Sequence, residues 1–194
     1  VQHFPDAGCF VWSSGEARLF FRCPTEFRHR PSQADLLHVD LEWRGQPMVH
    51  DAGTYSYNPD PANSGSPARE RRDSDPIDNL PPLTQRATGN GSRLPAFKTG
   101  ALSMAAVHNT VTFDGEEPMQ KAGRFLYLPW PRGSASWDDT REWFRADHDG
   151  WRKRGLRHRR SVHAPRADAF TVADELTGVG MHRGRLHWLI ADLP

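Results

Sequence analysis

The sequence predicts one all-β domain of antiparallel strands, and three features of the 194-residue chain support this fold class. Alternation of apolar and polar residues with a period of two is the dominant pattern, which is typical of strands with one buried face. No window shows a long apolar stripe with the 3.6-residue period of a helix, so helix should be minor. The length fits one all-β domain, or one ordinary domain that carries a long insertion.

The best-defined strand covers residues 37–44, where every odd position is apolar and every even position is polar. This alternation predicts that the odd side chains lie in the core and that the even ones turn to the other face. Residues 45–47, Gly-Gln-Pro, end the pattern, and a partner strand begins at Met48, as expected of an antiparallel hairpin. The side chains expected in the core are Leu37, Val39, Leu41 and Trp43.

Further short strands follow the same rule, several of them bounded by Gly, Pro or Asp. They are predicted at residues 10–12, 18–22, 109–113, 124–128, 170–172 and 186–190.

The stretch 58–100 differs from the rest, with seven prolines, four glycines and almost no aromatic residues. Such a composition buries little apolar surface, which predicts a long irregular insertion with little packed structure. A linker between two domains is the competing interpretation. The strands on either side lack the apolar material for two separate cores, so one domain with an insertion is favoured.

The charge balance excludes little by itself. Lys and Arg number 25 against 24 Asp and Glu, a net charge of +1, which favours neither nucleic acid nor a strongly acidic partner. No apolar run approaches the length of a signal-peptide core or a membrane span. The chain begins at Val1 rather than at Met, so we expect a piece of a longer protein.

The two cysteines, Cys9 and Cys23, flank a predicted hairpin around residues 13–16. A two-residue loop would leave them out of register, and only an odd loop centred near Glu16 would place them opposite each other. A disulfide therefore stays open at this stage, and the cysteines do not define the cellular compartment.

Two blocks of sequence resemble heparinase II/III-like proteins. The first runs over residues 33–45, QADLLHVDLEWRG, and continues at 51–58, DAGTYSYN; the second is HNTVTFDG at 108–115. Weaker similarity extends through 123–128 and 148–151 to 159–162, so most of the chain outside the insertion is covered.

The resemblance implies a two-part polysaccharide lyase, with an N-terminal α/α toroid that is absent from this chain. The chain itself would be the C-terminal antiparallel β-sandwich, a supersandwich-like fold. The substrate implied is a uronate-containing acidic polysaccharide, such as a glycosaminoglycan or an alginate, and the implied location is the periplasm or the exterior of a bacterium. The main catalytic groups of the family lie on the toroid, so the chain should be inactive alone.

The resemblance also implies a metal site. The family's ligands fall on Gln33, Asp51 and His108, and a catalytic His of the family falls on Pro31. A carboxamide binds zinc far less well than an imidazole, so zinc should bind weakly or not at all. His38 and His50 could in principle substitute, but strand parity places both on the wrong face.

Candidate catalytic residues are His108, Tyr55 and Tyr57. The two tyrosines lie two apart, so they share a face of an extended segment and suit contact with sugar rings. Core packing of the tyrosines, a local hydrogen-bonding role for His108 and a turn-capping role for Asp51 remain open alternatives.

A basic cluster between residues 141 and 168 holds nine Lys or Arg against four acidic residues. Such a cluster attracts a polyanion, and Arg159 and Arg160, together with Arg124, are candidates for substrate binding. A solvated strand pair whose Arg stems cover apolar surface is the plainer alternative. A nucleic-acid-binding module is a rival, although no known motif of that class is present. A non-catalytic carbohydrate-binding or scaffold domain is another, which the changes at Pro31 and Gln33 favour.

Overall fold

The computed structural model describes residues 1–25, 33–53, 101–123, 126–138, 140, 143–166 and 169–192. Within these ranges the protein is nearly all antiparallel β-structure, which confirms the predicted fold class. Helix is limited there to three short 3-10 turns, η3 (Ala101–Ser103), η4 (Ala105–Val107) and η5 (Arg152–Arg154). None of the described helices is long and apolar enough to cross a membrane.

The first sheet is a five-stranded meander in the order β1-β2-β3-β4-β5. Two-residue turns join β2 to β3 and β4 to β5, and the second of these uses Arg44 and Gly45 with φ of 53° and 73°. A two-residue turn with positive φ at both central residues matches the twist of the paired strands. The strands are β1 (Gln2–Phe4), β2 (Cys9–Ser14), β3 (Ala17–Arg22), β4 (Val39–Trp43) and β5 (Gln46–Val49).

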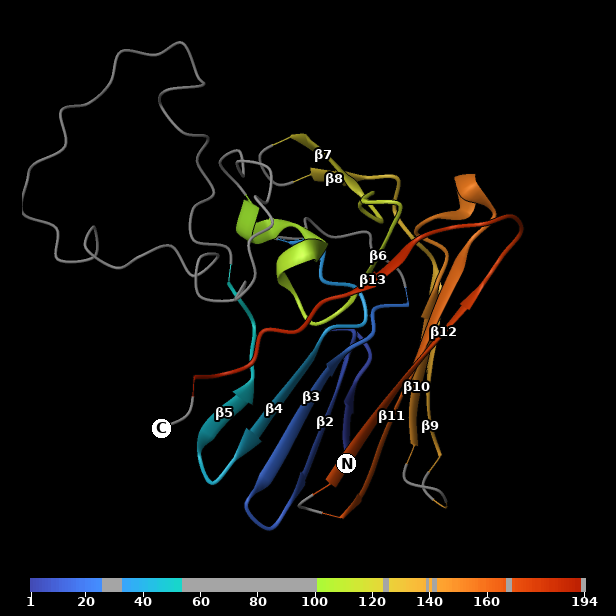
Figure 1. Ribbon diagram of the computed structural model, residues 1–194. Helices are drawn as coiled ribbons and strands as arrows, with labels where there is room; N and C mark the ends of the chain where they lie inside the picture. Colours follow the sequence, from blue (N-terminus) through green and yellow to red (C-terminus); the bar gives the residue numbers. More distant parts are fainter. Residues whose placement is uncertain are drawn as a thin grey trace, which may run out of the picture.

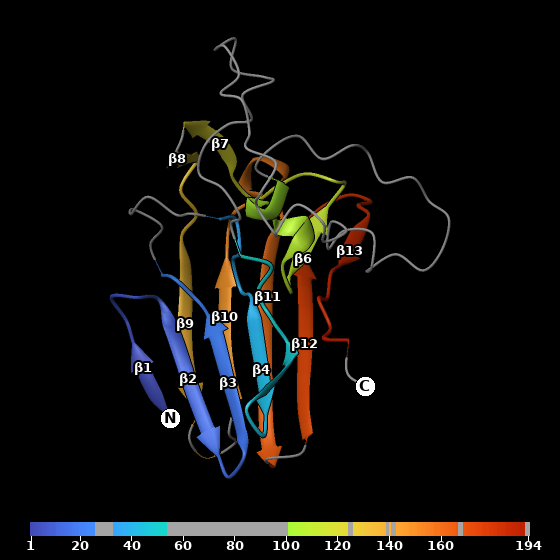
Figure 2. The same cartoon turned by 90° about the vertical axis from the view of Figure 1, so that its left-hand side faces the viewer.

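The second sheet has four strands in the order β12-β11-β10-β9, and it faces the first sheet as the other layer of a sandwich (Figures 1 and 2). All three pairings are antiparallel, with one register shift between His163 and Arg166. The strands are β9 (Gly133–Asp138), β10 (Trp143–His148), β11 (Arg157–Arg166) and β12 (Ala169–Thr177).

Two small sheets and the turns η3 and η4 lie at one end of the sandwich (Figure 1). One sheet pairs β6 (Val111–Phe113) with β13 (Gly184–Leu186), and the other pairs β7 (Gln120–Gly123) with β8 (Leu126–Leu128). The C-terminal segment returns to the first sheet, where Ile190 forms a bridge with Val49.

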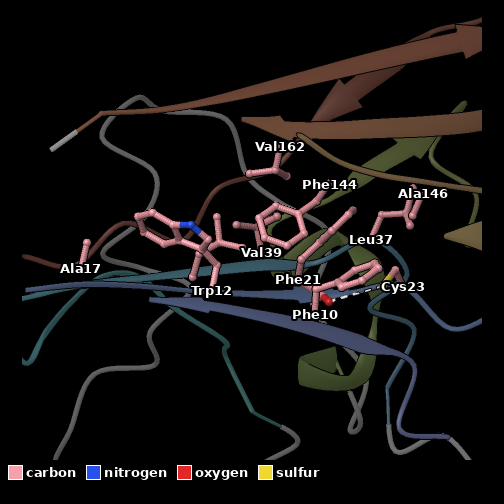
Figure 3. Close-up of a cluster of buried hydrophobic side chains, with 11 residues drawn as sticks. Phe10, Trp12, Ala17, Phe21, Cys23, Leu37, Val39, Phe144, Ala146 and Val162 are labelled. Carbon is pink, nitrogen blue, oxygen red and sulfur yellow. Dashed lines mark hydrogen bonds between the residues drawn. The ribbon is translucent and has the colours of Figure 1, made fainter. Parts of the chain in front are cut away.

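The main core lies between the two sheets, and Figure 3 shows side chains from both layers meeting there. Phe144 on β10 is fully buried and contacts Phe10 on β2 with a ring-centroid distance of 5.4 Å. Burial of aromatic and aliphatic surface of this kind is the main favourable term in folding. The buried members are Phe10, Trp12, Ala17, Leu19, Phe21, Cys23, Leu37, Val39, Phe144, Ala146 and Val162.

The predicted alternation in the strand at residues 37–44 holds in part. Leu37 and Val39 are buried, and Leu41 and Trp43 are partly buried against the same core. His38 departs from the pattern because it is fully buried rather than turned outward. The regular strand begins only at Val39, so the period-two rule does not apply before it.

The cysteines are two free, buried thiols. The β2–β3 turn has two residues, Gly15 and Glu16, and the register pairs Cys9 with Arg22 rather than with Cys23. Burial raises the pKa of the Cys23 thiol to about 12, so the thiolate that would attack an oxidised partner is disfavoured. The predicted insertion at 58–100 lies outside the described residues.

Replacing Phe144 with Ala should lower the free energy of unfolding by about 3–5 kcal/mol, because the change leaves a cavity between the two sheets. Urea denaturation followed by circular dichroism measures the change. As a control, Gln46→Ala at the exposed start of β5 should shift stability by no more than about 0.5 kcal/mol. Equal effects of the two substitutions would contradict the placement of the core.

Candidate functional site

A cluster of two histidines and one carboxylate lies at the end of the sandwich that carries η4. His38 directly precedes β4, Asp51 follows β5, and His108 follows η4. One potential ligand atom from each of the three residues lies within 4.8 Å of the others. The β4–β5 hairpin and the turn η4 therefore bring residues 70 positions apart in the sequence into one group.

The distances within this cluster indicate electrostatic contact. The Nδ1 atom of His108 lies 3.4 Å from Oδ1 of Asp51, and Nε2 of His38 lies 3.8 Å from Oδ2 of the same carboxylate. The two imidazole rings meet edge to face with their centroids 5.6 Å apart. Asp51 is thus placed between the two rings.

Gln33 joins the cluster through its amide group. Its Nε2 donates to Oδ2 of Asp51 at 2.6 Å and to Oδ2 of Asp35 at 3.0 Å. The structure therefore brings together the three positions assigned to the metal site from the sequence, Gln33, Asp51 and His108. Binding of a metal there stays a prediction.

The expectation that strand parity keeps His38 out of this site is corrected by the backbone at Leu37. Leu37 adopts a positive φ of 58°, so the chain turns between Gln33 and His38 instead of running as an extended strand. Parity holds only where successive residues are extended. The turn directs His38 toward Asp51, on the side that parity had excluded.

Hydrogen bonds fix the tautomer of His38. The backbone N–H of Asn109 donates to Nδ1 of His38 at 3.0 Å, so Nδ1 carries no proton. The proton of the neutral ring then lies on Nε2, which is 2.8 Å from Oδ1 of Asp40. His38 in this state donates to a carboxylate and has no lone pair to offer on Nε2.

His108 differs from His38 because neither of its ring nitrogens has a hydrogen-bond partner among the described residues. Its side chain is fully buried, and no described residue forms a hydrogen bond of good geometry with either ring nitrogen. A buried polar group without a partner costs free energy, so such a group in a native structure points to a ligand, an ion or a catalytic role. His108 is the strongest functional candidate among the described residues.

The charge on Asp51 is stabilised by its surroundings. Burial by itself would raise the pKa of Asp51, but the contact with His108 and the backbone N–H of Gly53 outweigh burial and hold the pKa well below its usual range. The carboxylate is therefore ionised at neutral pH, as a metal ligand or an anchor for a histidine requires.

These residues make an incomplete zinc site. His108 and Asp51 offer suitable donors, whereas Nε2 of His38 is committed as a donor and Gln33 presents an N–H to Asp51. A structural zinc ion takes four protein ligands and a catalytic one takes three. The described residues thus supply two firm ligands, fewer than either class of site needs.

Glu117 supports the segment that carries His108. Its carboxylate accepts a hydrogen bond of 2.7 Å from the backbone N–H of Ala105 at the start of η4. Burial raises the pKa of Glu117 to about 6, although hydrogen bonds from the backbone N–H groups of Ala105 and Ala106 oppose the shift. A buried titratable group therefore lies close to the candidate site.

Asn109 connects the site to the rest of the domain. This residue is fully buried, and its Nδ2 donates to the carbonyl oxygens of Val39 and His50 at 2.9 and 3.0 Å. Its Oδ1 accepts from the N–H of Leu189, and its own carbonyl accepts from Arg160. Asn109 is a hub that sequence reasoning quoted in the His-Asn-Thr block without assigning it a role.

Arg160 is a structural residue rather than a substrate-binding one. Its side chain is fully buried, forms two hydrogen bonds with Asp174 at 2.7 and 2.9 Å, and donates to the carbonyl of Leu37 at 2.8 Å. Because the side chain is fully buried, its guanidinium is not open to a polysaccharide. The β11 alternation turns Arg160 inward and its neighbour Arg159 outward.

A chain of buried histidines extends the Asp174 contact. The N–H of Gly150 donates to Nδ1 of His148, Nε2 of His148 lies 3.3 Å from Nδ1 of His158, and Nε2 of His158 lies 2.7 Å from Oδ1 of Asp174. Burial lowers the pKa of His148 well below 6.5, and it also lowers the pKa of His158. Both rings are therefore neutral and pass hydrogen bonds in one direction, toward Asp174.

Much of the basic cluster is neutralised by ion pairs. Arg159 pairs with Glu175 at 3.0 Å and Arg152 with Asp149 at 3.3 Å, while Arg157 and Arg154 contact Asp147 and Glu116. This pairing supports the plainer alternative of a solvated strand pair. Arg159 remains exposed, and its substrate-binding role stays a prediction.

Four positions singled out in the sequence lie outside the described residues: Pro31, Tyr55, Tyr57 and Arg124. Sequence reasoning excluded His38 from the site and assigned no role to Asn109. The position of Asn109 in the His-Asn-Thr block that resembles the family could have indicated its importance. No sequence pattern predicts the turn at Leu37.

Fold and site together define a two-layer β-sandwich domain with a histidine–carboxylate cluster at one end. Residues 1–193 match the family described as "Heparinase II/III-like, C-terminal", so the chain belongs to this family. The resemblance inferred from the two sequence blocks is thereby confirmed. No curated protein matches the sequence.

Two solved structures share the fold. The heparinase III BT4657 gene product has a TM-score of 0.62 and 17% sequence identity, and its form with methylated lysines has a TM-score of 0.60 and 17% identity. Each similarity covers 100% of this chain and 24% of the solved chain. The chain thus spans about a quarter of the length of these proteins.

Substitution of Asn109 by Ala should lower the free energy of unfolding by about 3 kcal/mol or more, because it leaves two buried carbonyls and one N–H without partners. Asn109→Asp keeps the acceptor for Leu189 but loses both donors, so it should also destabilise. Urea denaturation measures both changes. Stability within about 0.5 kcal/mol of the native protein would contradict the role of the hub.

Acid stability should depend on Asp174. Burial acts to raise its pKa, but hydrogen bonds from His158 and Arg160 outweigh burial and lower the pKa from 3.8 to about 2. A lowered folded-state pKa stabilises the protein above about pH 4, and this contribution is lost as pH falls toward 2. Asp174→Asn should therefore show a shallower loss of stability across this range.

The matched control for this prediction is Glu175→Gln, which breaks an exposed ion pair one residue away. An exposed pair contributes about 0–1 kcal/mol, so this variant should keep the acid transition of the native protein. Urea midpoints measured from pH 2 to 7 give both curves. Identical curves for Asp174→Asn and the native protein would argue against the assigned ion pair.

Proposed function

We propose that this chain is the C-terminal domain of a polysaccharide lyase that cleaves uronate-containing acidic polysaccharide by β-elimination. Membership of the heparinase II/III-like family supports the class of enzyme. The rest of the parent protein, an N-terminal α/α toroid by this proposal, carries the other catalytic groups. The polysaccharide itself would place the parent protein in the periplasm or outside the cell.

The observation that carries the proposal is the buried His108, whose ring nitrogens have no hydrogen-bond partner among the described residues, beside an ionised Asp51. β-Elimination requires neutralisation of the uronate carboxylate, removal of the C5 proton and protonation of the departing O4. His108 can exchange a proton or hold a ligand, and Asp51 can orient its ring. Tyr55 and Tyr57 follow Asp51 in the sequence and are proposed to contact the sugar.

In the full parent protein, His108→Ala should lower lyase activity by about 10²-fold or more, the range for loss of a proton-transferring group. Formation of the unsaturated uronate, followed by ultraviolet absorbance, measures the rate. Arg18→Ala, an exposed residue on β3, serves as the control and should leave the rate unchanged. Full activity of the His108 variant would refute the assignment.

The isolated 194-residue chain should show no appreciable cleavage, because its described residues supply only part of the elimination machinery. The same absorbance assay tests this on the chain alone. Unsaturated product from the isolated chain would overturn the two-part description.

Zinc binding at the cluster is proposed to be weak or absent, since Gln33 stands where an imidazole would complete the ligand set. Gln33→His should raise zinc affinity strongly, because it adds a nitrogen donor next to Asp51 and His108. Calorimetry on metal-free protein measures the affinity. An unchanged affinity would show that the three positions do not form a metal site.

A non-catalytic carbohydrate-binding or scaffold domain is the second candidate function. One observation favours it: both oxygens of Asp51 already accept hydrogen bonds, Oδ1 from Gly53 and Oδ2 from Gln33. A carboxylate satisfied in this way can be purely structural. Retained polysaccharide binding without cleavage in the full parent protein would favour this function over the lyase.

A further inference from the structure

The buried pair His148 and His158 belongs to a series of hydrogen bonds that the His108 cluster does not use. The backbone N–H of Gly150 donates to Nδ1 of His148, so the proton of that ring lies on Nε2, 3.3 Å from Nδ1 of His158. The proton of His158 then lies on its own Nε2, 2.7 Å from Oδ1 of Asp174. Every bond in the series therefore points the same way, from the donor at Gly150 to the acceptor at Asp174.

One more proton cannot enter this series without breaking a bond. If His148 binds it, Nδ1 of that ring becomes a donor and faces the N–H of Gly150. If His158 binds it at Nδ1, Nε2 of His148 must become the acceptor, which moves the His148 proton to Nδ1 and gives the same result. Two donors cannot share a hydrogen bond, so the contact between His148 and Gly150 is lost in both cases.

The other place for two facing donors is between the two rings, and burial disfavours it. Both rings are fully buried, whereas Gly150 is half-buried and the turn η5 that follows it is exposed. Residues 149–155 also lie outside the ladder of β10 and β11, which ends at the pair His148 and His158. In Figure 1 η5 is the orange coil beyond the end of this sheet. The segment that carries Gly150 is therefore the part that moves.

The surroundings of the pair hold both rings neutral in the closed structure. Burial lowers the pKa of both rings, and the charges of Arg157 and Arg160 on β11 lower the pKa of His148 further. Asp174 on β12 raises the pKa of His158, but its carboxylate also binds Arg160 at 2.7 Å. Water must reach the rings before a proton is bound readily.

The carboxylates on the neighbouring elements do not produce an opening in acid. Glu117 precedes Pro118, which packs against Gly150, and burial raises the pKa of Glu117 to about 6. A carboxyl with a raised pKa binds its proton more tightly in the folded state, so acid favours the closed structure through Glu117. The other carboxylates near the segment are in ion pairs: Asp147 with Arg157, Asp149 with Arg152 and Glu116 with Arg154.

We propose that His148 and His158 form a pH-sensitive switch, in which uptake of a proton breaks the hydrogen bond from Gly150 and releases residues 149–155 from the end of the sandwich. The pair shares no residue with the His108 cluster, so the switch stands whether or not the parent protein is a lyase.

Trp151 connects the switch to the site end of the domain. Its buried ring lies 4.6 Å from the ring of Phe113 and 5.2 Å from that of His148, and its Nε1 donates to the carbonyl of Glu116. Release of the segment withdraws Trp151 from the small core that also holds Val111, Phe113 and Leu156. Because β6 lies in this core and begins three residues after His108, acid loosens the support of the candidate site.

The direction of the pH effect follows from the proton content of the closed and released states. In the released segment the rings meet water, and their pKa returns toward 6.5. Above that pH both states are neutral. Below it the released state binds a proton that the closed state excludes, so the opening constant rises by about tenfold per pH unit for each proton taken up.

Hydrogen exchange on the whole chain between pH 7 and 4.5, corrected for the intrinsic pH dependence of exchange, tests the switch. The protection factors of the Gly150 and Gly155 amides should fall by about tenfold between pH 6 and 5. Amides of β2 and β3 should remain more strongly protected at each pH, because the segment opens without unfolding the sheets. Constant protection of the segment, or protection equal to that of β2 and β3 at every pH, would overturn the proposal.

Variants without titratable rings assign the effect to the pair. His148→Asn keeps an acceptor for Gly150, and His158→Gln keeps a donor for Asp174, so the double variant should lose the pH dependence of the segment. His163→Gln, on the same strand β11 but partly exposed, is the matched control and should behave as the native chain does. An unaltered pH dependence in the double variant, or its loss in the control, would contradict the proposal.

Long-range ¹H–¹⁵N NMR of the native chain keeps the test decisive if the double variant does not fold. At pH 7 Nδ1 of His148 should be an unprotonated acceptor, and as the pH falls the ring should bind its proton together with the change in the Gly150 amide signal. A proton on Nδ1 of His148 at pH 7, or protonation of the ring with the Gly150 signal unchanged, would refute the switch.

Discussion

The hydrogen bonds of the Asn109 side chain hold together the end of the domain that carries the His108 cluster. One buried carboxamide joins the start of β4, the segment after β5 and the C-terminal segment, and its backbone contacts His38 and Arg160. Buried backbone groups must find partners, and here several irregular segments find them in a single residue. The loops that carry the site are therefore held without regular secondary structure.

The same residue determines the chemistry of its neighbours. By donating to Nδ1 of His38, the Asn109 backbone sets the tautomer of that ring and turns it into a donor toward Asp40. His108, one position earlier, receives no such bond from the described residues. Two histidines in one cluster thus have different roles: His38 is committed to the structure, and His108 is left for function.

The sequence predicted the fold class and strands near β2, β3, β4, β6, β8 and β12, because alternation reports burial directly. It predicted no strand at β1 or β9, and of the strand expected at 186–190 only Leu186 lies in β13. It placed His38 on the wrong face because the positive φ at Leu37 leaves no mark in the hydrophobic pattern. It offered Arg160 as a surface residue because an arginine is seldom fully buried, and only the register reveals that Asp174 lies opposite it. Gln33, Asp51 and His108 lie together, as the family resemblance implied, whereas the hydrogen bonds that distinguish their roles required coordinates.

The tautomeric states of His38 and His108 test this account most directly, and long-range ¹H–¹⁵N NMR of the histidine side chains measures them. The account predicts that Nδ1 of His38 is an unprotonated acceptor with its proton on Nε2, and that Asn109→Ala, which frees the segment, disturbs this pattern. It also predicts that the His108 ring responds to added zinc in the Gln33→His variant. A proton on Nδ1 of His38 in the native chain would contradict the account, because Asn109 could not then organise the site as described.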